Sequence, residues 1–249
     1  MDDDQRKAPL SRDGEALYHA CEREGCPVCL VMLERMEREM DLWQYEVVSD
    51  MRNRQTLLHS KGFCARHTWQ LALAPNLPTP FALAMVYRSL LPDVLAEVQH
   101  DLEQARVSRS TRRPNFLRRL WRRRRGQTEV AEGIHFFPAC PLCRRQADVE
   151  RELIQELLTL LSSQDFLQQL PRTTGFCLLH LTQATHAAPS PEQRVRLLEC
   201  QSACLQRNLA ELDELVRKHD YRFLQEPRGE EMTAWRRAAE LLVGNRGVY

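Results

Sequence analysis

The sequence CPVC at residues 26–29 recurs as CPLC at residues 140–143, and GFCARH at residues 62–67 recurs as GFCLLH at residues 175–180. The offset is 114 residues for the first motif and 113 residues for the second. A single C-x2-C is a weak signal, but two complete sets with matching internal spacing indicate an internal duplication. The chain is therefore expected to consist of two homologous halves.

The composition favours helices over strands. The chain contains 37 leucines, 2 isoleucines and 9 glycines, and unbranched leucine keeps its rotamer freedom in a helix. No strand-like alternation of useful length is present. Apolar residues instead recur at helical spacing in the first half at Leu33, Met36, Met40, Trp43 and Val47, and in the second half at Leu153, Leu157, Leu160 and Leu161. We therefore predict an all-α fold.

The order of elements is expected to be the same in both halves: a helix, a short helix, another helix, a proline turn and a long helix. The chain of 249 residues is long enough for a buried core without disulfides. We predict a helical repeat at 14–105, a basic connector at 106–128, a second helical repeat at 129–223 and a C-terminal helix within 224–249. That last helix should cover residues 228–243 and end at Gly244.

Each half contributes three cysteines and one histidine in the pairs C-x2-C and C-x2-H. Residues three apart share one face of a helical turn, and a helix N-terminus favours the thiolate. Four such ligands form the closed tetrahedron of a structural zinc site, so two zinc ions per chain are expected. The simplest assignment gives each repeat its own Cys3His site, although an exchange of pairs between repeats remains open. The predicted ligands are Cys26, Cys29, Cys64 and His67, then Cys140, Cys143, Cys177 and His180.

Two other uses of these cysteines compete with zinc. An iron–sulfur cluster also accepts cysteine-rich ligation with a histidine. A Cys-Pro-x-Cys pair at a helix start can serve as a redox dithiol, but the thioredoxin-like context requires a preceding strand, which the pattern does not predict. A thiol-redox or iron–sulfur sensor is thus the alternative function. The remaining thiols of Cys21, Cys200 and Cys204 are interpreted as packed helix residues.

The paired CPxC and G-[FL]-C-x2-H motifs resemble an uncharacterised bacterial family of tandem-repeat cysteine/histidine proteins, a domain of unknown function. The run SDMRNR at residues 49–54 and the tail EEMTAWRR at residues 230–237 resemble the same family. The resemblance covers most of the chain apart from the first dozen residues and the connector. It implies no established activity.

The connector is strongly basic. Residues 104–128 contain ten arginines and no acidic residue, whereas the flanking regions are mildly acidic. Apolar side chains at Phe116, Leu117, Leu120 and Trp121 follow helical spacing. The segment is therefore a candidate nucleic-acid surface, a candidate anionic-membrane surface or a solvated linker. The candidate contact residues are Arg112, Arg113, Arg118, Arg119, Arg122, Arg123, Arg124 and Arg125.

No catalytic constellation is evident, because the chain has no Gly-rich phosphate loop, no GxSxG and no HExxH. The N-terminal Met1-Asp2-Asp3-Asp4 has the wrong charge for a secretory signal, and three prolines interrupt the uncharged stretch of residues 68–87. We therefore expect a cytoplasmic chain without a transmembrane segment. The predicted function is a non-enzymatic, zinc-stabilised binding or adaptor protein that contacts nucleic acid or a protein partner.

Overall fold

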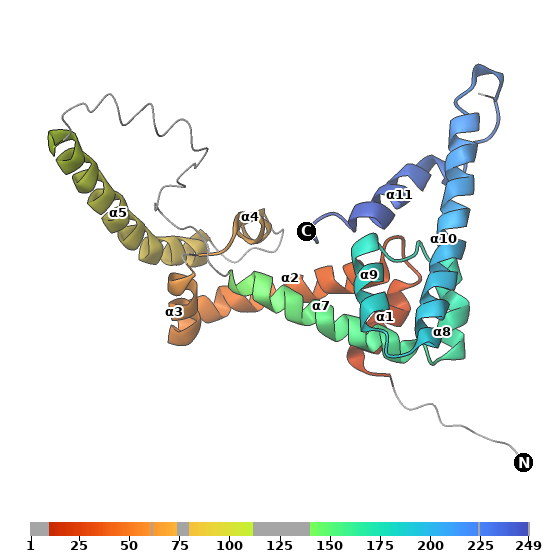
Figure 1. Cartoon of the computed structure of the whole chain (residues 1–249), viewed down its shortest axis with the longest axis horizontal. Coiled ribbons are helices and arrows are strands. Elements are labelled where there is room, and N and C mark those ends of the chain that lie inside the picture. The colour runs from red at the N-terminus through yellow and green to blue at the C-terminus, as the bar shows by residue number, and fades with distance from the viewer. Residues whose placement is uncertain (1–9, 61, 74–79, 112–139, 224, 249) are drawn as a thin grey trace, which may run out of the picture. The chain divides into compact units, whose positions relative to one another are not determined.

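A computed structural model describes residues 10–60, 62–73, 80–111, 140–223 and 225–248 of the chain. Every regular element in these ranges is a helix, which confirms the all-α prediction (Figure 1). The α-helices are α1 (Arg12–Ala20), α2 (Pro27–Ser49), α3 (Met51–His59), α4 (Ala65–Leu73), α5 (Pro80–Thr111), α7 (Pro141–Leu160), α8 (Gln164–Gln169), α9 (Leu178–Ala187), α10 (Pro191–Arg217) and α11 (Ala234–Val243). Short 3₁₀ turns are η1 (Leu170–Arg172), η2 (Tyr221–Phe223) and η3 (Glu230–Thr233).

The predicted order of elements is the same in both halves of the structure. Helices α2, α3, α4 and α5 follow the first CPxC motif, and α7, α8, α9 and α10 follow the second. Pro27 and Pro141 are the first residues of α2 and α7, where the missing N–H removes no helical hydrogen bond. Ser190 caps α10 by accepting a hydrogen bond from the Gln193 backbone nitrogen at 3.2 Å.

The C-terminal helix ends where the sequence predicts but begins later. Gly244 has a φ of 85°, which a residue with a Cβ rarely adopts, and it terminates α11 after Val243. The residues before Ala234 form the 3₁₀ turn η3 instead of the predicted first turns of the helix. The helix is therefore shorter than the predicted 228–243.

The chain divides into two compact units that cross the predicted repeat ranges. Unit 1 comprises Met1–Glu39 and Arg145–Tyr249, and unit 2 comprises Met40–Arg144. The boundary falls inside α2 and inside α7, so each of these helices contributes to both units. The compact units therefore differ from the repeats at 14–105 and 129–223.

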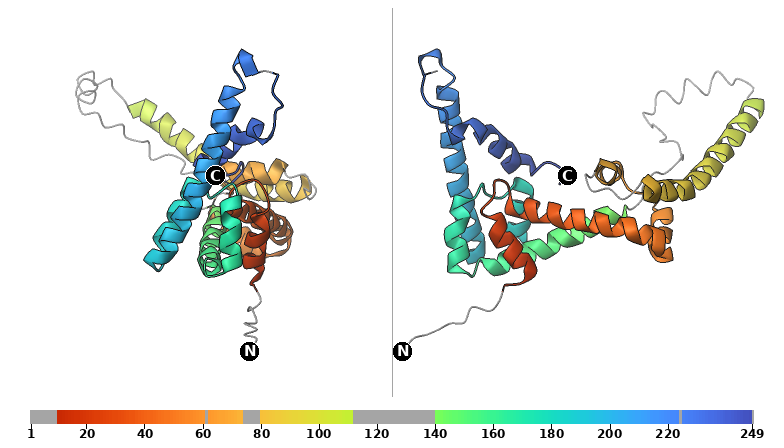
Figure 2. Two further views of the ribbon diagram at one scale, coloured as in Figure 1. Left: turned by 90° about the vertical axis from the view of Figure 1, so that its right-hand side faces the viewer. Right: turned by 180° about the vertical axis from the view of Figure 1, so that it is seen from behind.

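The core of unit 1 is formed by α7, α8, α10 and the segments that pack against α10. The predicted stripe of Leu153, Leu157, Leu160 and Leu161 is buried, with at most 3% exposure. Phe166 of α8 is fully buried and contacts the ring of Tyr18, with 6.1 Å between the ring centroids. Segments α9, η1, η3 and α11 pack against α10 (Figures 1 and 2). This core holds the second C-x2-H pair near the first CPxC pair.

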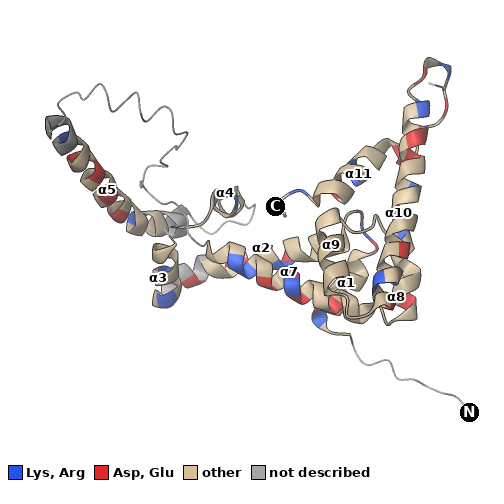
Figure 3. Ribbon diagram, viewed as in Figure 1, with Lys and Arg blue, Asp and Glu red and all other residues tan. Residues whose placement is uncertain are grey.

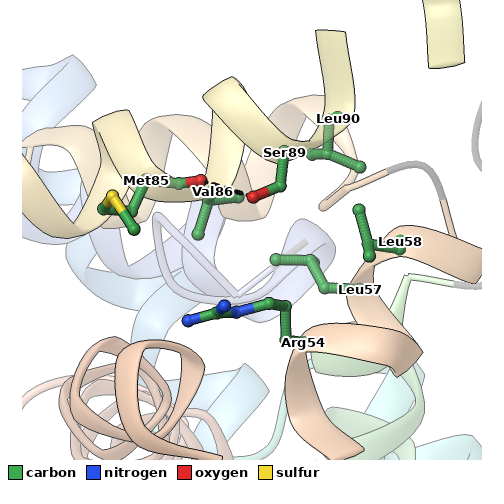
Figure 4. Close-up of a pocket in the computed structure, with 7 residues that line it drawn as sticks. All are labelled: Arg54, Leu57, Leu58, Met85, Val86, Ser89 and Leu90. Atoms are coloured by element: carbon green, nitrogen blue, oxygen red, sulfur yellow. Dashed lines mark hydrogen bonds between the residues drawn. The ribbon is translucent and has the colours of Figure 1, made fainter. Parts of the chain in front are cut away.

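Unit 2 is smaller, and its contacts include those between α3 and α5. Figure 4 shows Leu57 and Leu58 of α3 opposite Val86 and Leu90 of α5. The cavity between them measures about 10 Å³, room for about one water molecule, so this gap is too small for a substrate.

The apolar stripe predicted along α2 is only partly buried. Met36 is 5% exposed, whereas Leu33, Met40 and Trp43 are half-buried and the side chain of Val47 is not described. Trp43 contacts Phe63 edge-on, with 5.7 Å between the ring centroids. The buried face of α2 lies nearer its start, at Val28, Val31 and Met32, because the first turns of the helix carry the metal ligands.

Candidate metal centres

The eight predicted ligands form two groups of four in the structure. Site 1 contains Cys26, Cys29, Cys177 and His180, and site 2 contains Cys64, His67, Cys140 and Cys143. In each group the sulfur and nitrogen atoms lie within 4.8 Å of one another. Both groups have the predicted Cys3His composition. Each combines the CPxC pair of one repeat with the C-x2-H pair of the other, so the exchanged arrangement replaces the assignment of one complete set to each repeat.

Each site lies within a single compact unit. All site 1 ligands belong to unit 1, and all site 2 ligands belong to unit 2. Because the pairs come from distant parts of the chain, each site joins segments that are separated by many residues. A metal in either site would therefore cross-link its unit.

Helix starts position the ligands of site 1. Cys29 lies in the first turn of α2, and Cys177 is the N-cap residue of α9, which carries His180 in its first turn. The backbone nitrogen of Cys26 donates a hydrogen bond to Asn245 Oδ1 at 3.0 Å. Gly25 donates its backbone N–H to Thr174 Oγ1, also at 3.0 Å. These two bonds hold the CPxC turn through its backbone, independently of the ligand side chains.

Site 2 is built in the same way. Cys64 immediately precedes α4, and His67 lies in the first turn of that helix. Cys140 immediately precedes α7, and Cys143 lies in its first turn. Gly62 has a φ of 102°, which allows the chain to turn into α4. The local architecture of both sites therefore follows from the same two motifs.

The ligand distances agree with tetrahedral coordination. A tetrahedron with Zn–S bonds of ~2.3 Å and Zn–N bonds of ~2.05 Å has S···S edges of about 3.8 Å and S···N edges of about 3.6 Å. The Sγ atoms of Cys29 and Cys177 lie 3.8 Å apart, and those of Cys64 and Cys143 lie 3.6 Å apart. The distances from sulfur to histidine Nδ1 are 3.3–3.5 Å in both sites. All nine cysteines of the chain are free thiols.

The histidine of site 1 is held by a carboxylate. His180 directs Nδ1 towards the cysteines, and its Nε2 lies 3.1 Å from Glu150 Oε1. The imidazole is fully buried, and the side chain of Glu150 is 15% exposed. A carboxylate on the outer nitrogen fixes the ring orientation and makes the inner nitrogen a better metal ligand.

The histidine of site 2 has a cation beside it. Arg66 Nη2 lies 3.3 Å from His67 Nε2 and 4.0 Å from Cys143 Sγ. Cys64 and Cys143 are half-buried, whereas all four ligands of site 1 are buried. Site 2 is thus the more accessible of the two.

The pKa values of the four ligands of site 1 are shifted in different directions. Burial raises the pKa of Cys26 to about 12, and hydrogen bonds from Cys177 and Cys26 raise the pKa of Cys29 further. Hydrogen bonds from Cys26 and Cys29 hold the pKa of Cys177 far below its usual value. Burial lowers the pKa of His180, but its bonds to Cys177 and Cys29 outweigh this and raise the value to about 11. A metal must therefore displace protons when it enters this site.

In site 2 the thiols differ from each other. Burial and a hydrogen bond with Cys64 raise the pKa of Cys143 to about 12. Burial would also raise the pKa of Cys64, but hydrogen bonds from His67, Cys143 and Cys140, and the charge of Arg66, lower it. One thiolate is therefore already favoured in this site.

The other residues singled out from the sequence are not part of these groups. Cys21 and Cys204 are buried and Cys200 is half-buried, as expected for packed thiols. The candidate contact residues of the connector, Arg112, Arg113, Arg118, Arg119, Arg122, Arg123, Arg124 and Arg125, lie outside the described residues. Sequence reasoning missed Glu150 and Arg66, because one more charged residue on a helix carries no distinguishing signal.

Among the described residues, no helix is both long and apolar enough to cross a membrane. No curated protein and no solved structure matches the chain. A family of unknown function, DUF6062, matches residues 15–247. The match extends over nearly the whole chain and includes both sets of ligands, so this protein belongs to the DUF6062 family.

Proposed function

We propose that this protein is a non-enzymatic helical binding module that two zinc ions stabilise. The observation that carries the proposal is the pair of Cys3His groups with tetrahedral distances. Three thiolates and one imidazole are the ligand set of structural zinc, and four protein ligands leave no open position for a substrate or a water nucleophile. The ions would stabilise the fold and leave binding to the helical surface.

The long helices carry the surface best suited to a partner. On α10, apolar side chains recur at heptad-like spacing and are 43–71% exposed: Val195, Leu198, Leu205, Leu209 and Val216. On α5, Leu91, Leu95, Val98 and Leu102 follow the same spacing and are 43–63% exposed. Apolar stripes of this kind mark helix-pairing surfaces. We therefore place a protein partner with an amphipathic helix ahead of nucleic acid.

Nucleic acid remains the second candidate partner because of the arginines of the connector. This reading rests on the composition of residues 104–128. Replacement of residues 122–125 by serine should weaken retention on immobilised DNA and flatten its salt dependence if these arginines contact phosphates. No effect of the replacement at low salt would exclude nucleic-acid contact through residues 122–125.

A thiol-redox or iron–sulfur sensor is the alternative function, and one observation favours it. Cys64 and Cys143 of site 2 are half-buried, and exposed thiolates are the ones that oxidants reach. Site 2 would then report the redox state instead of holding the fold.

Metal content and the visible spectrum distinguish these functions. The chain is purified without oxygen or chelator, and zinc, iron and sulfide are measured on the same sample. We expect about two zinc ions per chain and no colour. Iron with sulfide and absorption near about 400 nm would replace the proposal with an iron–sulfur sensor. A metal-free protein with reactive thiols would replace it with a dithiol switch.

A further inference from the structure

The exposed apolar stripe of α10 has the spacing of a two-stranded coiled coil. From Val195 to Val216 its steps alternate between three and four residues, the spacing of heptad positions a and d. Position a is occupied by Val195, Ser202, Leu209 and Val216, and position d by Leu198, Leu205 and Leu212. Valine at a with leucine at d favours two parallel strands, and a single polar residue at a fixes the register. The stripe therefore has the composition of a helix that pairs with one other helix.

This stripe is separate from the face that α10 buries in its own unit. The buried residues of α10 are Leu197, Gln201, Cys204 and Asn208. Each of them is followed directly by a residue of the stripe, and one residue corresponds to a rotation of about 100° around the helix axis. Leu198, Leu205 and Leu209 are accordingly 43–59% exposed, and Ser202 is exposed. A second helix can therefore pack on the stripe without displacing the core of unit 1.

The charges beside the stripe are complementary between two parallel copies of α10. In a parallel pair, the residue at position g faces position e of the next heptad in the partner helix. At the start of the stripe these positions hold Arg194 and Glu199, and both side chains are exposed. Arg194 Nε donates a hydrogen bond to the backbone oxygen of Thr185 at 3.1 Å, which holds the guanidinium beside α10. Two identical helices in parallel would therefore form this ion pair twice.

The opposite orientation of the two helices is less favourable. An antiparallel pair brings position e of one helix beside position e of the other. Two of the three e positions of the stripe are acidic, Glu199 and Asp213, so like charges would meet. Figure 3 shows the acidic and basic residues along α10, separated by uncharged stretches. The charges therefore favour the parallel orientation.

The stripe of α5 is a weaker candidate for the second helix. Arg88 and the small Ala105 stand at the heptad positions before Leu91 and after Leu102, so this stripe is shorter than that of α10. Pro92 lies inside α5 and removes a backbone hydrogen bond there. A second α10, in contrast, matches the stripe along its whole length and places serine opposite serine. The occupant that fits the α10 stripe best is thus another α10.

We propose that α10 pairs in parallel with α10 of a second copy of this chain. Leucines at position d pack against each other, Ser202 faces its own counterpart, and Arg194 pairs with Glu199 of the partner subunit. The same surface is used on both copies, as in a two-fold symmetric dimer. This inference rests on the part of the proposed function that places a protein partner on the helical surface, and it identifies that partner as the chain itself.

Sedimentation of the full zinc-loaded chain over a range of concentrations tests the pairing. We expect a dimer whose dissociation constant rises at least about a hundred-fold in Leu209→Asp, because the substitution buries a charge in each helix of the pair. Leu95→Asp is the matched control, since it makes the same change at the 56% exposed Leu95 in the stripe of α5. It should leave the dimer unchanged. Circular dichroism checks that both variants keep their helix content.

A second variant strengthens the pair, a result that misfolding cannot produce. Ser202→Val places a β-branched residue at the one polar a position and should lower the dissociation constant about ten-fold. Ala203→Val makes a similar change at the next residue, which is exposed and lies outside the stripe, and should have no effect.

Charge reversal tests the orientation. Arg194→Glu should raise the dissociation constant about five-fold, and Arg194→Glu with Glu199→Arg should restore it, because exposed ion pairs contribute modestly and only a parallel pair brings these residues together. A double variant as weak as the single one would contradict the parallel orientation.

Three results would overturn the pairing itself: a monomer at every concentration, a dimer that Leu209→Asp leaves intact, or equal dissociation by Leu95→Asp, which would make α5 part of the interface. Zinc is measured on the same samples. A monomer with two zinc ions would overturn only this inference and leave the stripe to another protein. A dimer without zinc would overturn the zinc-stabilised function and leave the pairing of α10 standing.

Discussion

The two metal sites share their ligand set but differ in their surroundings. Site 1 is fully buried, and a carboxylate from Glu150 holds its histidine. Site 2 exposes two of its thiols in part, and Arg66 lies beside its histidine. The sequence explains the difference in the partners of the two histidines. The residue that corresponds to Arg66 in the second repeat is Leu179, and the residue that corresponds to Glu150 in the first repeat is Met36.

We infer from this difference that the two sites would hold a metal ion with different stability. Site 1 lies where the CPxC turn is also bonded to Thr174 and Asn245, so a metal bound there would complete an already connected core. Site 2 belongs to the smaller unit, and two of its thiols are half-buried. Two copies of the same four-ligand set would therefore give one inert structural site and one site that exchanges a bound metal more readily.

The largest expected effect is the loss of a ligand of site 1. Cys29→Ser should remove one zinc per chain and unfold unit 1, because binding of structural zinc contributes about 10–16 kcal/mol to folded zinc domains. Cys64→Ser should remove the other zinc but leave most of the helix content of unit 1. Zinc content and thermal melting by circular dichroism measure both effects.

The matched control is Cys204→Ser, since Cys204 is a buried thiol that belongs to neither site. This variant should keep two zinc ions and lose only the stability expected of a packing change. Equal melting of Cys29→Ser and Cys204→Ser would show that site 1 contributes packing and not coordination.

The next effect concerns the carboxylate of Glu150, which holds His180 in site 1. Glu150→Gln should weaken zinc binding at site 1 by about 10–100-fold, the usual cost of removing a partner of a ligating histidine. Competition with a chromophoric chelator measures the affinity. Asp148→Asn on the same helix is the control, because Asp148 pairs with Arg151 on the surface and should leave the affinity unchanged.

The order of metal release tests the difference in exposure. Treatment with a thiol-reactive mercurial should release one zinc from site 2 about ten-fold faster than the other, because half-buried thiolates react first. A metal indicator resolves the two phases, and the fast phase should be missing in Cys64→Ser. Release of both ions in a single phase would remove the functional distinction between the sites.

The sequence predicts much of this arrangement because its signals are local. The C-x2-C and C-x2-H spacings, Pro27 and Pro141 at helix starts and the leucine stripe of α7 all depend on neighbouring residues. The pairing of motifs does not. Cys29 and His67 are 38 residues apart, and Cys29 and His180 are 151 apart. The entropic cost of closing the loop differs between these two pairings by only about 1.2 kcal/mol. This difference is far smaller than the free energy of metal binding.

Packing around α2 and α7 therefore decides which CPxC pair and which C-x2-H pair form one site. This packing cannot be inferred from the pattern of a single sequence. The same reason explains why Glu150 was not predicted. It is one of 34 acidic residues, and only the fold places it beside His180. The apolar stripe predicts more burial along α2 than the structure shows. The buried face lies near the start of this helix, because its first turns contribute both ligands and core residues.

The pH dependence of zinc binding should also differ between the sites. The raised pKa values of Cys26, Cys29 and His180 mean that these groups are protonated at neutral pH in the metal-free protein. Zinc must displace those protons, so its affinity falls as the pH falls. Each site also holds one thiol with a lowered pKa, Cys177 in site 1 and Cys64 in site 2, so the difference between the sites comes from the three raised groups of site 1. We expect a steeper dependence for site 1, measured by calorimetry in buffers of different ionisation enthalpy.

The smallest effect is expected at Arg66. A site with three thiolates, one imidazole and a divalent ion has a net charge of about −1, which a nearby guanidinium stabilises. Arg66→Leu, which introduces the residue found at the corresponding position of site 1, should weaken zinc binding at site 2 about five-fold, because the site is partly screened by water. Arg66→Lys keeps the charge and should retain most of the affinity. If both variants bind zinc equally weakly, Arg66 acts through its planar contact with His67 and Cys143 and not through its charge.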